Sequence, residues 1–232
     1  MSSSPSPAPD LAIAPPLASR AVAGFGASIL GGAALGGAAW FADGLAWPLS
    51  LLIPANLIGI WLGVAFVLGA SARTIPTGAL RGVIGLLSAV AVYYVLIAAF
   101  GQGFRAIGAS HAATIWGMVA LLAGPALGAA GAVWRHGAGW PRAIGVALFA
   151  SALFAEGFVF GAPRLVRLDQ IAGDPGALLF AAEMILGLLL PWFLLRRDER
   201  VRGYAALAGL AVVSALAIEP VTAILRGLAD RF

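Results

Sequence analysis

Residues 80–100 read LRGVIGLLSAVAVYYVLIAAF, and this stretch decides the fold class because only one of its residues, Arg81, is charged. A helix that crosses the hydrocarbon core of a membrane needs about 20 mostly apolar residues. Six further stretches have the same character, so the chain is predicted to contain about seven membrane-spanning helices. The expected helices cover residues 20–42, 52–72, 80–100, 111–134, 142–162, 177–195 and 203–225.

The composition favours a membrane protein and excludes several other classes. Hydrophobic residues make up 61% of the chain and charged residues 10%, whereas soluble domains carry roughly 25% charged residues. Cysteine and lysine are absent, which excludes disulfides, thiolate metal sites, a retinal Schiff base and a P-loop. We therefore expect an all-α polytopic helix bundle in a cell membrane, the bacterial inner or plasma membrane, with no cofactor.

Arginine placement predicts how the bundle is oriented. Residues 1–19 are rich in Pro and Ser and are expected to form a flexible tail, followed by a single transmembrane domain over 20–232. Nine of the 14 arginines flank the predicted cytoplasmic ends of the helices. Because loops rich in arginine stay in the cytoplasm, the predicted orientation is N-in and C-out. Since the arginines lie at helix ends beside lipid headgroups, we expect the lipid bilayer as partner and no nucleic acid.

Three glutamates lie inside the predicted spans at a similar depth. Counting about 1.5 Å per residue from the nearest cytoplasmic arginine places Glu156, Glu183 and Glu219 roughly 20–25 Å above the cytoplasmic end. A carboxylate inside a bilayer is costly and often marks a functional site. We interpret these residues as an outward-facing polar pocket that binds or transports a small solute, a cation or a proton. Further candidate ligands at the same end are Asn56, Tyr94 and His111.

Each candidate also has a purely structural interpretation. The helix could end at Glu219, which precedes a proline, and leave its carboxylate at the surface. Glu183 could pair with an arginine of the neighbouring outer loop, and Asn56 could satisfy carbonyls freed by a nearby proline. Tyr94 could belong to an interfacial aromatic belt, and His111 could be a solvated helix-end residue. Convergence of the glutamates in space would favour the pocket.

A stripe of small residues marks the first predicted helix, with Gly24, Ser28, Gly32 and Gly36 at four-residue spacing. Such stripes let two helix backbones approach closely. The stripe either packs inside the chain's own bundle or docks a membrane partner or a second copy. Docking defines the alternative function, a non-catalytic membrane subunit. An intramembrane enzyme ranks last because the sequence has no HExxH or GxSxG motif, and two histidines in distant loops indicate no metal site.

Residues 50–135 carry a set of aromatic and glycine motifs. They are Trp61-x4-Phe66-x2-Gly69, then Tyr93-Tyr94, then Trp116 followed by Gly124-Pro125-x2-Gly128-x2-Gly131 and Arg135. With these motifs the chain resembles uncharacterised multi-pass membrane proteins common in actinobacteria. The resemblance implies a polytopic helical fold and carries no activity over to this chain.

Overall fold

The computed structural model describes residues 17–45, 57–100, 109–165 and 175–229, without the side chains of residues 17–21, 162–165, 175, 215 and 217–229. The described residues form seven helices and no strand, which confirms the predicted all-α class. The helices are α1 (Leu17–Gly44), α2 (Ile58–Ala70), α3 (Ile75–Phe100), α4 (Ala109–His136), α5 (Gly139–Leu165), α6 (Pro175–Leu194) and α7 (Arg200–Ala229).

Five helices are long and apolar enough to cross a membrane, namely α1, α3, α4, α5 and α6. Helix α2 has 13 residues, so it is about 20 Å long and shorter than a hydrocarbon core of roughly 30 Å. The sequence predicts a spanning helix over 52–72, whereas the described helix begins at Ile58, and residues 46–56 lie outside the described part. Helix α7 continues past Pro220, so it does not end at Glu219. The N-in, C-out orientation stays a prediction.

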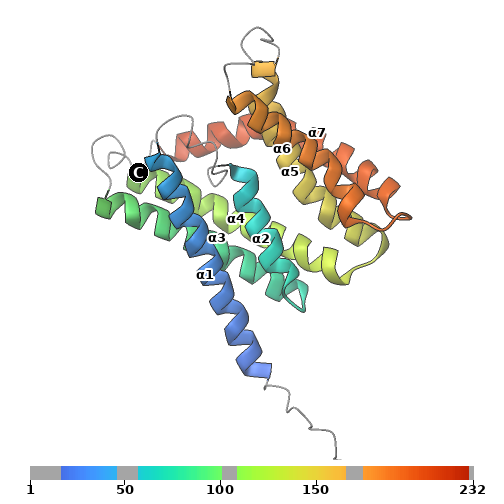
Figure 1. The fold of residues 1–232 in the computed structure, drawn as a ribbon, viewed down its shortest axis with the longest axis horizontal. Coiled ribbons are helices and arrows are strands. Elements are labelled where there is room, and N and C mark those ends of the chain that lie inside the picture. The colour runs from blue at the N-terminus through green and yellow to red at the C-terminus, as the bar shows by residue number, and fades with distance from the viewer. Residues whose placement is uncertain (1–16, 46–56, 101–108, 166–174, 230–232) are drawn as a thin grey trace, which may run out of the picture.

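The helices form two groups joined through α2, α4 and α5. Figure 1 shows α1–α4 on one side, while α5, α6 and the beginning of α7 lie on the other. Helix α3 packs against α1 and α4, and α5 packs against α6 and α7. The largest core cluster contains Phe66 of α2, Leu86 and Val90 of α3, and Leu127 of α4. The Phe66 ring stacks on Phe149 of α5 at 5.0 Å, so this core reaches both groups.

Small residues bring α1 and α3 into backbone contact. A Cβ atom at Gly32 would overlap the carbonyl oxygen of Gly85, and one at Gly36 would overlap the carbonyl oxygen of Ala89. Neither position can therefore hold a side chain while the helices keep their present separation.

The same face of α1 also meets a buried arginine of α3. The Arg81 guanidinium occupies the space beside Gly24 that a Cβ atom would need, and it binds the Ser71 hydroxyl at 2.9 Å. Ser28 is buried and donates its hydroxyl to the Gly24 carbonyl at 3.1 Å. The whole small-residue stripe thus faces the interior of its own chain.

Candidate functional site

Helix α2 begins inside the bundle, and a carboxylate from another helix binds its first N–H groups. Glu156 of α5 accepts the Ile58 N–H at 2.9 Å and the Gly59 N–H at 2.6 Å. The first N–H groups of a helix have no partner within the helix, and Leu57, which precedes α2, offers no side-chain cap. Glu156 therefore serves as the cap and places its charge at the positive end of the helix dipole.

Glu183 of α6 lies beside this capped helix end. Its Oε1 atom fills the space where a Cβ at Gly59 would lie, and the Gly59 N–H binds Glu156, so the two carboxyl groups lie beside the same residue of α2. Glu156 is 8% exposed and Glu183 is 5% exposed. Among the described residues, neither oxygen of Glu183 has a hydrogen-bond partner. The structure therefore brings together two of the three glutamates singled out in the sequence.

A cavity of about 260 Å³ lies next to the start of α2. Its walls come from the last part of α1 and α3 and from the first part of α2 and α4. The lining residues are Asp43, Ile58, Trp61, Tyr93, Tyr94 and Trp116. Among the described residues, the wall therefore consists mainly of aromatic rings, together with one carboxylate and Ile58.

Three of the aromatic residues of the cavity contact one another. The Tyr93 hydroxyl donates a hydrogen bond to the Asp43 carboxylate. The Tyr93 ring meets the ring of Trp61 edge-on at 6.3 Å and that of Tyr94 edge-on at 4.9 Å, an arrangement that aromatic pairs favour. Ile58 connects this cavity with the carboxyl pair, since the residue lines the cavity and its N–H binds Glu156.

The other predicted pocket residues occupy different places. Tyr94 lines the cavity. His111 is half-buried near the start of α4 and does not line the cavity. Glu219 belongs to α7, but its side chain is outside the described part, as is the whole of Asn56.

Sequence reasoning missed most of the cavity wall. Trp61 and Trp116 appear in that reasoning only in the motifs that carry the family resemblance, and Asp43 is not selected as a candidate at all. One signal was available, because Asp43 follows directly on the predicted span 20–42 and therefore lies at the same end as Tyr93 and Tyr94. What the sequence does not show is that these elements are neighbours.

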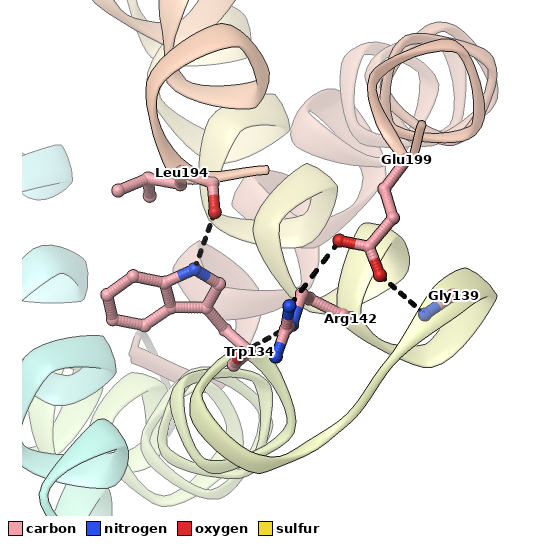
Figure 2. Close-up of polar contacts among 5 residues, drawn as sticks. All are labelled: Trp134, Gly139, Arg142, Leu194 and Glu199. Carbon is pink, nitrogen blue, oxygen red and sulfur yellow. Dashed lines mark hydrogen bonds and ion pairs between the residues drawn. The ribbon is translucent and has the colours of Figure 1, made fainter. Parts of the chain in front are cut away.

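A second polar cluster lies at the opposite end of the bundle (Figure 2). Glu199 accepts the Gly139 N–H at 2.6 Å and pairs with Arg142 at 3.6 Å. The Arg142 Nε donates to the Trp134 carbonyl at 3.1 Å, and the Trp134 indole donates to the Leu194 carbonyl at 3.0 Å. The cluster joins the α4–α5 connection to the α6–α7 connection, so its contacts have a structural explanation.

Comparison with known proteins identifies a family but no activity. A model described as Family of unknown function (DUF6518) matches residues 15–227. No curated protein and no solved structure matches the chain. The family match agrees with the expected likeness to uncharacterised proteins, while a distribution among actinobacteria stays an expectation. The function must therefore be argued from the cavity and the carboxyl pair.

Proposed function

We propose that this chain, which belongs to DUF6518, a family of unknown function, binds a small organic cation in the cavity beside α2. The observation that carries the proposal is the composition of the cavity wall. Four aromatic residues and Asp43 are among the residues that line a space of about 260 Å³. An aromatic wall with one anionic group has the chemistry that recognises alkylammonium ions.

The attraction has two parts. The face of an aromatic ring carries partial negative charge, and a cation within about 6 Å of a ring gains roughly 0.5–1 kcal/mol at exposed sites and about 2 kcal/mol when desolvated. The Asp43 carboxylate adds a full negative charge, which the Tyr93 hydroxyl orients by its hydrogen bond. A neutral ligand of the same shape would be attracted less strongly both by the rings and by the carboxylate. The cavity is therefore expected to bind cations in preference to neutral molecules.

The size of the cavity favours a small ligand. Pockets for drug-sized molecules occupy about 300–1,000 Å³, and this cavity lies just below that range. A metal ion is a poorer fit, because no group of three His, Cys, Asp or Glu side chains gathers within the described residues. Tetramethylammonium and choline have suitable charge and size and serve as probes.

The place of the cavity in the bundle supports uptake from one side of the membrane. Its walls come from the end of the bundle opposite the Arg142–Glu199 cluster. In the predicted N-in orientation that end faces away from the cytoplasm. An outward-facing binding site is what a solute transporter or a membrane binding protein requires. The alternative of docking a partner through α1 has less support, since Gly32 and Gly36 contact α3 of the same chain.

Calorimetric titration of the purified protein in lipid nanodiscs with tetramethylammonium tests the proposal. Trp116 forms one wall and is 37% exposed, so Trp116→Leu is expected to fold while losing one ring contact of about 1–2 kcal/mol. The dissociation constant should then rise roughly 5- to 30-fold. Trp140→Leu is the matched control, because Trp140 is exposed at the start of α5 and does not line the cavity. No binding by the parent, or equal binding by both variants, would refute the proposal.

A further inference from the structure

The carboxyl pair at the start of α2 does not line the proposed cation site and requires its own explanation. Glu156 and Glu183 are both more than nine-tenths buried and both lie beside Gly59 of α2. Two ionised carboxylates in such a place would repel each other without water to screen them. A buried charge persists only when a partner or a proton compensates it.

The two carboxyl groups have unequal surroundings. Glu156 accepts two N–H groups at the positive end of α2, which favours its ionised form. Glu183 receives no hydrogen bond from any described residue, although both of its oxygens are buried. If Glu183 is protonated, its O–H can donate a hydrogen bond to Glu156, which gives the buried group a partner. Only one negative charge then remains, so the repulsion between the two carboxylates is removed. Pairs of carboxyl groups that share one proton are a known outcome of such crowding.

A metal ion between the two groups is a weaker explanation. Two carboxylates supply too few ligands for a buried ion, and no third His, Cys, Asp or Glu side chain joins them in the described part of the chain. Four-coordinate and higher sites are the rule for protein-bound metals. The unpartnered Glu183 oxygens therefore favour a proton.

Ile58 connects the pair to the cavity. The Ile58 N–H binds Glu156, and Ile58 also lines the cavity. At the end of the bundle where both sites lie, the described titratable side chains are Asp43 of α1, Tyr93 and Tyr94 of α3, and His111 near the start of α4. Helix α7 packs against α5, and the side chain of its Glu219 lies outside the described part. Helix α2 has no titratable side chain. Between Arg142 and the end of α6, the titratable side chains that the structure describes are Glu156 and Glu183, while the side chain of Arg164 in α5 lies outside the described part. A positive charge in the cavity thus lies beside Asp43 and close to the start of α2, where the Ile58 N–H binds Glu156 of the carboxyl pair.

We propose that Glu156 and Glu183 hold one exchangeable proton and that a cation entering the cavity releases it. The Glu183 O–H bond breaks, the proton leaves to water, and the carboxylate that remains is balanced by the arriving cation. The net charge of the buried region is the same before and after. The inference rests on the proposed cation site and adds that this site works by exchange of a cation for a proton.

The proton itself can be observed without any cation. Infrared difference spectra between acidic and alkaline samples should contain the C=O stretch of a buried protonated carboxyl group, and Glu183→Gln should lose this band. Glu199→Gln is the matched control, since Glu199 is equally buried but lies in the opposite cluster. If the band persists in Glu183→Gln, the assignment of the proton to this pair is wrong. Glu183→Asp keeps a carboxyl group and should keep a shifted band, which separates loss of the proton from loss of the fold.

Coupling is measured by adding tetramethylammonium to weakly buffered protein with a pH indicator. The parent should release about one proton per bound cation, and its affinity should rise by up to about tenfold per pH unit across the titration. Glu183→Gln should bind the cation, release no proton and show a flat pH profile. If the parent binds the cation without releasing a proton, the exchange of a cation for a proton is refuted while the cation site itself stands. Absence of binding would overturn the proposed function, and the infrared result would still decide whether the pair holds a proton.

Discussion

Replacing Gly32 of α1 by alanine is expected to push α1 and α3 apart. The added Cβ atom would overlap the Gly85 carbonyl oxygen and would lie 2.9 Å from the Gly85 carbonyl carbon and 3.0 Å from the Ser88 Cβ. Ordinary contact begins at 3.4 Å, so the backbones must separate by more than half an ångström. Two of the three atoms belong to the backbone, and a change of rotamer cannot relieve the overlap.

The energetic cost follows from the packing that this separation loosens. Helix α1 packs almost entirely against α3, so a shift at Gly32 disturbs most of its contact surface. Inserting a methyl group into a closely packed interface costs about 1–3 kcal/mol. In a chain of this size, each kcal/mol lowers the melting temperature by roughly 2–4 °C. We therefore expect Gly32→Ala to melt about 2–12 °C below the parent.

Gly37 provides the matched control on the same helix. No atom lies within 4 Å of the position where its Cβ would be, and alanine is a better helix former than glycine by roughly 1 kcal/mol. Gly37→Ala should therefore melt at or slightly above the parent temperature. Both variants are heated in the same detergent, and the folded fraction left at each temperature is measured by size-exclusion chromatography with fluorescence detection. Equal melting of the two variants would contradict the close α1–α3 contact.

The remaining predictions concern the opposite cluster and the orientation. Glu199→Ala removes the acceptor of the Gly139 N–H and the partner of Arg142, so it should destabilise the protein by about 1–3 kcal/mol while leaving the affinity for tetramethylammonium unchanged. A loss of cation binding at unchanged stability would contradict the structural role of Glu199. Gly139 has a positive φ of 62°, so Gly139→Ala should lower the free energy of unfolding by about 1–2 kcal/mol, measured by thermal melts. Gly209→Ala is the control, because a Cβ atom there meets nothing within 4 Å. A C-terminal reporter should be active only outside the cytoplasm because the arginines favour the N-in orientation; cytoplasmic activity would exclude the proposed orientation.

The helical fold could be predicted well because apolar length is a local property of the sequence. The apolar run at 80–100 indicates a spanning helix, and α3 covers Ile75–Phe100. The start of α2 could not be predicted in this way, because the group that caps it is Glu156, which is 98 residues distant from Ile58. An apolar run over 52–72 contains no sign of that contact. Helix ends that depend on tertiary contacts are therefore the least predictable part of this fold.

The candidate site was only partly predictable for a related reason. Counting residues along helices gives depth, and it predicts a similar depth for Glu156 and Glu183, which both lie beside Gly59 in the structure. Depth says nothing about which face of a helix carries a residue or which helices are neighbours. The sequence therefore could not show that Trp61 and Trp116 face a cavity together with Asp43.

The most direct test of a charge-selective cavity compares choline with 3,3-dimethylbutan-1-ol, which has the same shape and no charge. Calorimetric titration of the parent protein in nanodiscs should show binding of choline and at least about tenfold weaker binding of the neutral alcohol, because only choline gains the ring and carboxylate attraction. Asp43→Asn removes the charge at the cavity wall and should reduce this preference. Equal affinity of the parent for the two compounds, or no binding of choline, would contradict the cation site.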